Sequence, residues 1–193
     1  MKRILITGFE PFGGEVTNPS WDALKLIPDE IGEYELTKLE IPVIFDTSAE
    51  LVIKKAEEID ADVILCIGQA GGRDAITPEM VGINLRYASI PDNCGNEPRD
   101  VKISEDGENA YFTTIPVRKI VDAILEMNIP SKASYSAGAY VCNDVIYSCL
   151  RHFDNSNVRF GFIHVPYSTD QNKSPSMPLE DIARAITRAI EVL

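Results

Sequence analysis

The chain has 193 residues, of which 45% are hydrophobic and 25% are charged. These are the proportions of an ordinary soluble globular protein, so a mainly disordered chain is excluded. A chain of this length buries about 70% of its unfolded surface on folding, and we expect residues 1–193 to form a single domain with one substantial core. The formal net charge of −12 repels phosphate backbones and anionic lipids, which argues against nucleic acids and membranes as partners.

The sequence shows no sign of export, of a membrane anchor or of a metal centre. Only a short apolar run separates Met1 from Gly8, too little for the core of a signal peptide, and no apolar run approaches the roughly 20 residues that span a bilayer. We therefore expect a cytoplasmic protein. Four cysteines are too few for a disulfide scaffold, and none forms a cluster with metal-ligand spacing. We predict neither a metal nor a cofactor.

The first half of the chain alternates predicted strands and helices. The apolar run from Arg3 to Thr7 predicts a strand buried on both faces, and Asn18 followed by Pro19 predicts the start of a short helix. Residues 34–43 predict a second strand, and residues 47–59 predict a helix that begins with a Thr-x-x-Glu capping box. Residues 62–67 repeat the buried-strand pattern. This order favours a largely parallel sheet with helices on both faces.

The second half continues the alternation. Residues 79–87 alternate apolar and polar side chains, which predicts a half-exposed strand, and a turn and a loop of about a dozen residues follow. The remaining predicted elements are helices over residues 116–127, 142–153 and 179–193 and strands over residues 133–136 and 158–165. We find no internal repeat or linker that would divide the chain.

Two glycine-bearing loops follow predicted strands, at residues 8–14 and 68–73. The carboxyl ends of strands in an open α/β sheet are where ligands bind, so the two loops predict a cleft. Neither loop has the spacing of a phosphate-binding motif. Phe9 and Phe12 suit an apolar ligand better than an anion, although burial in the core explains two phenylalanines equally well.

Cys142 and His164 are the candidates for chemistry. Cys142 lies at the predicted start of a helix, where the helix dipole favours a lowered thiol pKa and a reactive thiolate. His164 ends a predicted strand, so its imidazole has access to the same cleft. A base of this kind needs a third group to orient it, and the residues alone leave that group open among Glu10, Glu79 and Asp144.

Other residues of the same types have simpler explanations. Cys66 and Cys149 fall within buried apolar patterns and read as small core residues, and His152 reads as a surface cation near a helix end. From the residues alone, two functions compete. One is a cysteine–histidine hydrolase and the other is a non-catalytic α/β domain that binds a small ligand. A nucleoside or phosphate enzyme is disfavoured by the acidic charge.

Five motifs nevertheless match a known family in order and spacing. They are TGFEPFGG (residues 7–14), GQAGGR (68–73), IPDN (90–93), SAG with VCN (136–138 and 141–143) and GFIHVPY (161–167). The sequence resembles the cysteine-type pyroglutamyl peptidases, also called pyrrolidone carboxyl peptidases, over nearly its whole length. The resemblance implies a three-layer α/β/α sandwich with a mostly parallel, mixed sheet. It also implies removal of N-terminal pyroglutamyl residues from peptides without metal or cofactor, and self-association into dimers or tetramers.

The resemblance also assigns residues. It implies a triad with Cys142 as nucleophile, His164 as base and Glu79 as the group that orients the base. The residues that resemble the family's substrate slot are Phe9, Phe12, Gln69, Ile90 and Val141. Two positions depart from the family pattern, because Ser89 precedes the IPDN motif where an arginine is usual and Cys94 follows it in place of a glutamate.

Overall fold

A computed structural model describes the whole chain, residues 1–193, and its centre is a six-stranded sheet. The strand order is β2-β3-β1-β4-β8-β5. The bounds are β1 Lys2–Phe9, β2 Glu30–Ile31, β3 Tyr34–Ile41, β4 Val63–Gln69, β5 Thr77–Pro78 and β8 Arg159–Val165. Only the two edge strands, β2 and β5, run antiparallel to their neighbours, so the sheet is mixed and mostly parallel, as predicted.

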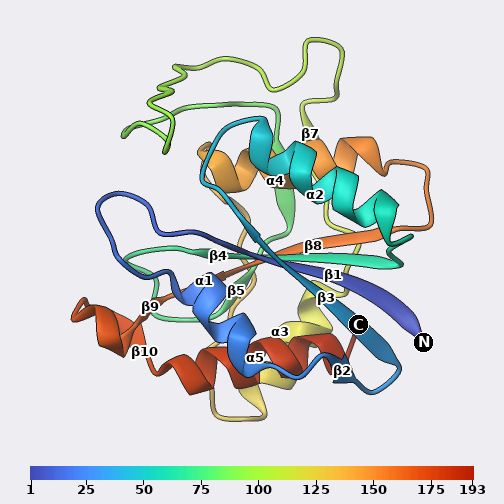
Figure 1. Cartoon of the computed structure of the whole chain (residues 1–193), viewed down its shortest axis with the longest axis vertical. Coiled ribbons are helices and arrows are strands. Elements are labelled where there is room, and N and C mark those ends of the chain that lie inside the picture. The colour runs from blue at the N-terminus through green and yellow to red at the C-terminus, as the bar shows by residue number, and fades with distance from the viewer.

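Helices cover both faces of this sheet (Figure 1). Their bounds are α1 Pro19–Asp22, α2 Thr47–Glu58, α3 Val117–Leu125, α4 Val141–His152 and α5 Leu179–Glu191, with short 3-10 helices at Ala23–Leu26 and Thr169–Gln171. Two small two-stranded pairs lie outside the main sheet, β6 Val81–Ile83 with β7 Ala110–Phe112 and β9 Tyr167–Ser168 with β10 Ser176–Met177. No helix combines the length and the apolar character needed to cross a membrane. The three-layer α/β/α class is confirmed.

The sheet divides the apolar interior into two clusters instead of the one core expected. Helices α1, α3 and α5 pack on one face over 29 buried residues, and α2 and α4 pack on the other over 19. Residues of β4 alternate between the clusters, with Val63, Leu65 and Ile67 on the first side and Ile64 and Cys66 on the second. A strand with helices on both faces is apolar on both faces, which is why this run is continuous in the sequence.

The strand order creates a topological switch point next to β1. The chain moves from β1 to β3 on one side of it and then returns to β4 on the other. Ligands of open α/β sheets bind at such a switch point, beyond the carboxyl ends of the strands. Here those ends are Phe9 of β1 and Gln69 of β4, in the two glycine-bearing loops.

The predicted capping box at residues 47–50 is wrong, although the helix itself is present as α2. Asp46 is the N-cap residue and has a φ of 61°, and its side chain makes no hydrogen bond to the helix. The Ser48 hydroxyl instead contacts the carbonyl oxygens of Pro42 and Ile44 and accepts a hydrogen bond from the Ile44 backbone N–H. These contacts hold the chain after β3 against the start of the helix. Thr47, whose hydroxyl the motif would need at the N-cap, is instead the first residue of α2.

Two predicted strands are also wrong or shortened. Of residues 79–87 only Val81–Ile83 form a strand, β6, which pairs with β7 apart from the main sheet. Residues 133–136 form no strand, and Ser134 makes only an isolated bridge to Glu79. Short runs bounded by loops depend on distant partners, so local alternation is a weak guide there. The segment between β6 and β7 extends beyond the α2–α4 layer in Figure 1.

Candidate active site

A cavity of about 190 Å³ lies at the switch point of the sheet. The residues that line it are Phe9, Phe12, Asn18, Val43, Gln69, Ala70, Arg73, Ala137, Tyr140, Cys142 and His164. It is smaller than the roughly 300–1,000 Å³ of sites for drug-sized ligands, which suits a small ligand. A larger groove of about 400 Å³ runs along α5, and its lining contains no cysteine or histidine.

Cys142 is the second residue of α4, and the strand β4 approaches its sulfur closely. A Cβ atom built on Gly68 would lie 3.2 Å from Cys142 Sγ and 2.7 Å from a ring carbon of Phe162. Glycine is therefore the residue that lets β4, β8 and the start of α4 meet here. The sulfur is held where the sheet and the helix converge.

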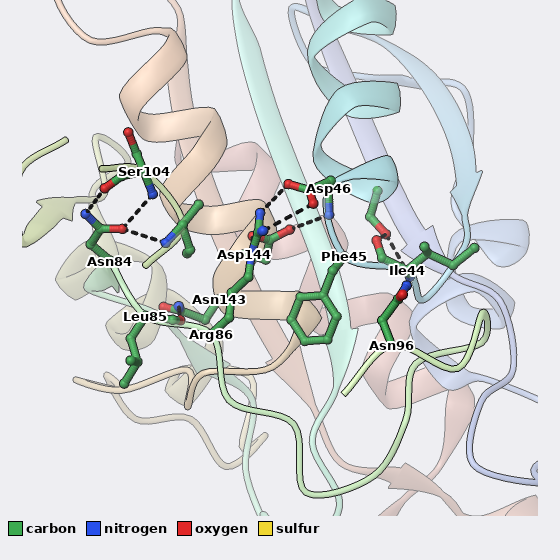
Figure 2. Close-up of polar contacts among 12 residues, drawn as sticks. Ile44, Phe45, Asp46, Asn84, Leu85, Arg86, Asn96, Ser104, Asn143 and Asp144 are labelled. Carbon is green, nitrogen blue, oxygen red and sulfur yellow. Dashed lines mark hydrogen bonds and ion pairs between the residues drawn. The ribbon is translucent and has the colours of Figure 1, made fainter. Parts of the chain in front are cut away.

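The residues after Cys142 anchor the first turn of α4 (Figure 2). The Asn143 side chain accepts a hydrogen bond from the Ile83 backbone N–H and donates to the carbonyl oxygens of Ile83 and Leu85. Asp144, which is fully buried, accepts from Arg86 Nε at 2.7 Å and from the Asp46 backbone N–H at 2.9 Å. These contacts join α4 to two other segments, residues 83–86 and Asp46, and so fix the position of Cys142.

His164 and Glu79 form a buried pair. His164 Nδ1 lies 2.7 Å from Glu79 Oε1, and the two residues are 3% and 1% exposed. The ring of His164 also packs against Phe162, with centroids 4.8 Å apart. Because Nδ1 is occupied by the carboxylate, Nε2 is the nitrogen left for the cavity that His164 shares with Cys142.

Arg73 contacts the same Glu79 carboxylate as His164 does. Its Nη1 donates to the same Glu79 Oε1 at 2.7 Å and to Thr77 Oγ1, and its Nη2 donates to the carbonyl oxygen of Ser136. The guanidinium therefore ties Glu79 to the loop that leads into α4. Glu79 Oε2 is buried and has no hydrogen-bond partner within the protein.

The structure thus separates the three carboxylates that the residues left open. Glu79 contacts His164, whereas Glu10 accepts a hydrogen bond from Asn93 Nδ2 at 2.8 Å and Asp144 pairs with Arg86. Neither Glu10 nor Asp144 lines the cavity. Of the three, only Glu79 has the geometry to orient the imidazole.

The expected lowering of the Cys142 pKa is wrong. Burial raises the pKa of this thiol to about 12, and the Glu79 charge acts in the same direction. The loss of solvation outweighs the charge of Arg73, which acts to lower the pKa, because an anion loses more hydration than a neutral thiol when both are buried.

The other two groups shift in the opposite direction. Burial lowers the pKa of His164, outweighing Glu79, whose hydrogen bond and charge act to raise it. The pKa of Glu79 is lowered although burial acts to raise it, because the hydrogen bond and charge of His164, with help from Ser134 and Arg73, favour the carboxylate. Near neutral pH the site therefore holds a neutral thiol, a neutral imidazole and an ionised Glu79.

Three of the five residues expected in the substrate slot line the cavity, and two do not. Phe9, Phe12 and Gln69 are in its wall. Phe9 is only 2% exposed and belongs to the core as well as to the cavity wall. Val141 is fully buried in the core and Ile90 is 44% exposed, and neither lines the cavity.

Several residues that line the cavity could not be predicted from the sequence. Arg73 stands in the GQAGGR motif, yet its contact with Glu79 depends on the fold around it. The sequence predicts Asn18 only as a helix cap. The structure confirms this role, since the Asn18 side chain accepts a hydrogen bond from the Ser20 backbone N–H. Tyr140 packs against Phe12 with ring centroids 6.4 Å apart, and only its place before Cys142 could have indicated it.

Cys66 and Cys149 were predicted to lie in the core and His152 on the surface, and the structure places them there. Cys66 and Cys149 are fully buried in the core, and His152 is on the surface, where its Nε2 lies 2.8 Å from Glu57. The structure contains no group of three or more histidine, cysteine or acidic side chains placed to hold a metal ion.

A cysteine at a helix start and an imidazole line one cavity of this α/β fold, and a buried carboxylate contacts the imidazole. Cysteine hydrolases use this arrangement. Comparison with known proteins defines the class further. Residues 2–193 match the family model described as pyroglutamyl peptidase. The chain belongs to this family, and the resemblance found in the motifs is confirmed.

Individual relatives cover almost the entire chain. The pyrrolidone-carboxylate peptidase of Staphylococcus saprophyticus is 47% identical over 197 residues, which cover 99% of this chain and 92% of the relative. The pyroglutamyl peptidase I structure from Bacillus amyloliquefaciens superposes with a TM-score of 0.95 at 40% identity and covers 100% of this chain and 96% of that one. The pyrrolidone carboxyl peptidase of Thermococcus litoralis gives 0.95 at 38% identity, with 100% and 93% covered.

Proposed function

We propose that this protein is a cysteine peptidase that removes N-terminal pyroglutamyl residues from peptides, with Cys142 as nucleophile, His164 as base and Glu79 as the group that orients the base. The observation that carries the assignment is the buried contact between His164 Nδ1 and Glu79 Oε1 beside the cavity that also contains Cys142. Family membership supports the substrate class.

In the first half of the reaction, the Cys142 sulfur attacks the carbonyl carbon that joins the pyroglutamyl group to the next residue. His164 Nε2 takes the thiol proton as the S–C bond forms, and it then gives that proton to the departing amine. The C–N bond breaks, the shortened peptide leaves and a pyroglutamyl thioester remains on Cys142. The imidazolium formed in between is stabilised by the Glu79 carboxylate.

In the second half, water hydrolyses the thioester. His164 removes a proton from the attacking water, and the same proton returns to the sulfur when the C–S bond breaks, which releases pyroglutamate. Backbone N–H groups at the start of α4, including that of Cys142, have no partner inside the helix, and they stabilise the oxyanion of both tetrahedral intermediates.

The cavity suits an uncharged ring. A pyroglutamyl group has apolar methylenes with one N–H and one C=O, and the walls around it are Phe9 and Phe12 with the Gln69 amide as a polar partner. An ordinary N-terminal amine is a cation, and removing it from water without a counter-charge costs several kcal/mol. Arg73, the charged side chain of the wall, is itself a cation.

Hydrolysis of a pyroglutamyl chromogenic amide tests the proposal. We expect turnover by the unsubstituted protein, poor cleavage of the matching prolyl amide, and loss of turnover by about 10⁶-fold in Cys142→Ala, as for other covalent nucleophiles. Cys149→Ala, a buried cysteine outside the cavity, is the matched control and should retain activity. A folded Cys142→Ala variant with substantial turnover would refute the mechanism, and binding without turnover by the unsubstituted protein would mark a ligand-binding domain.

We also propose that residues 1–193 act as one catalytic domain in the cytoplasm, on peptides with N-terminal pyroglutamate, as a homo-oligomer. The match of the family model to residues 2–193 supports the single domain, and the family resemblance supports self-association. Light scattering coupled to size-exclusion chromatography measures the oligomeric state, and a monomer at micromolar concentration would contradict that part.

A further inference from the structure

The Gln69 side chain lines the cavity, but its amide is held by a neighbour. Gln69 Oε1 accepts a hydrogen bond from Gln171 Nε2 at 2.9 Å. Gln171 ends the 3-10 helix Thr169–Gln171, on a different segment of the chain. The oxygen and nitrogen of an amide are nearly alike in shape, so the direction of this bond depends on what fixes Gln171.

Two backbone groups fix the Gln171 amide. The backbone N–H of Ser168 donates to Gln171 Oε1 at 3.0 Å, and the carbonyl oxygen of Thr17 accepts from Gln171 Nε2 at 3.5 Å. A backbone N–H only donates and a carbonyl only accepts, so the Gln171 amide has one orientation that satisfies both. Gln171 therefore offers its NH₂ group to Gln69, and Gln69 must face it with its oxygen.

The NH₂ group of Gln69 is consequently left for the cavity. This nitrogen has no hydrogen-bond partner within the protein and is not among the buried polar atoms, so it is accessible. Side chains alternate along β4: Gly68 faces the Cys142 sulfur, and Gln69 approaches from the opposite face. The Gln69 side chain therefore reaches the cavity from the face of β4 that lies away from the thiol.

Building on the proposed function, we propose that Gln171 is a specificity-determining positioning residue that holds the Gln69 NH₂ group toward the lactam carbonyl of the substrate. A pyroglutamyl ring supplies an acceptor at that place. A prolyl ring has a methylene there and would leave the donor without a partner, which costs binding free energy. The orientation of one amide thus contributes to the distinction between the two rings.

The variant Gln171→Glu reverses the orientation with little change in shape. A carboxylate still accepts from the Ser168 N–H, but it presents an acceptor to Gln69. Gln69 must then turn its NH₂ group to the new carboxylate and its oxygen to the cavity. Asn172→Asp is the matched control, because it adds the same charge one residue further on, where the side chain contacts only the Asp170 carbonyl oxygen.

The test measures ligand binding by calorimetry in Cys142→Ala protein, so that turnover plays no part. The probes are 2-pyrrolidinone and pyrrolidine-2-thione, which have the same ring but differ in the strength of the acceptor. We expect a preference for the lactam of about ten-fold, the equivalent of roughly 1.4 kcal/mol. The preference should fall to about one in Gln171→Glu and persist in Asn172→Asp.

A double-substitution cycle separates positioning from a purely structural role of Gln171. In a Gln69→Ala background, Gln171→Glu should change the lactam affinity less than two-fold, because the amide that it orients is gone. An unchanged lactam preference in Gln171→Glu, an equal loss with and without Gln69, or no binding of 2-pyrrolidinone would overturn the proposal. Turnover of a pyroglutamyl amide by the unsubstituted enzyme is measured separately and tests the proposed function alone.

Discussion

The substitution Glu79→Gln tests the proposed triad most directly, because it keeps the size of the side chain and removes its charge. Glu79 Oε1 accepts two hydrogen bonds of 2.7 Å, from His164 Nδ1 and from Arg73 Nη1, at a site that is 1% exposed. An amide has one oxygen and one NH₂ group. Whichever way it turns, it cannot carry the negative charge that the imidazolium requires.

The expected effect is large and falls on kcat. In serine proteases, the corresponding change from aspartate to asparagine lowers kcat about 10⁴-fold because the imidazole takes the wrong tautomer. The similar burial here and the two short hydrogen bonds predict a loss of about 10³–10⁴-fold, or roughly 4–5.5 kcal/mol of transition-state stabilisation. The carboxylate does not line the cavity, so KM should change less than ten-fold.

The assay is steady-state hydrolysis of a pyroglutamyl aminomethylcoumarin amide, with circular dichroism to verify the fold. His152→Gln is the control, because it removes the other histidine, which pairs with Glu57 on the surface. That variant should keep the activity of the unsubstituted protein. Equal losses in the two variants, or a Glu79→Gln protein that changes KM alone, would refute the assignment of base and orienting group.

Three further predictions rest on packing and burial. Gly68→Ala places a Cβ atom 2.7 Å from the Phe162 ring and 3.2 Å from Cys142 Sγ. The ring must shift and the sulfur is crowded, so we expect kcat to fall at least about ten-fold in the same assay. Asp144→Ala leaves Arg86 with Asp46 as its only ion-pair partner and leaves the Asp46 backbone N–H without its acceptor, so it should lower the free energy of unfolding by about 1–3 kcal/mol in urea. Burial raises the pKa of the Cys66 thiol from 9.0 to about 12. Above pH 9 the folded protein therefore keeps a proton that the unfolded chain loses, and the free energy of unfolding falls as the pH rises. In Cys66→Ala, the decrease in the free energy of unfolding between pH 8 and pH 10 should be smaller by about 1.4 kcal/mol.

Each of these has a result that would contradict it. Full activity of Gly68→Ala would show that the contact with the sulfur is unimportant. A change below 1 kcal/mol in Asp144→Ala would mean that α4 is held by other contacts. The same loss of stability between pH 8 and pH 10 with and without Cys66 would mean that this thiol does not ionise on unfolding.

The elements that were predicted correctly are those whose determinants are local. The strands β1 and β4 are continuous apolar runs that end at glycine-bearing loops, and Asn18 before Pro19 begins a helix. In contrast, β5 has two residues and exists only because β8 lies beside it. No local pattern distinguishes such a strand from a loop.

The same division applies to the site. The positions of Cys142 and His164 at the ends of elements were visible in the sequence, but the choice of Glu79 from the residues alone was not. That contact spans 85 positions, and the Arg73 contact depends on the loop that joins β4 to β5. The thiol pKa was predicted with the wrong sign because the helix start is a local feature, whereas burial comes from elements far apart in the chain.

The high pKa of Cys142 changes how the proposed reaction must begin. Because burial raises the pKa of this thiol, the neutral thiol is the favoured form in the free enzyme near neutral pH. Ionisation must then accompany the attack on substrate, with His164 taking the proton as the S–C bond forms. Because Arg73 shares Glu79 Oε1 with the imidazole, the carboxylate is less basic than it would be alone, and the proton stays on His164, from which it can reach the leaving amine.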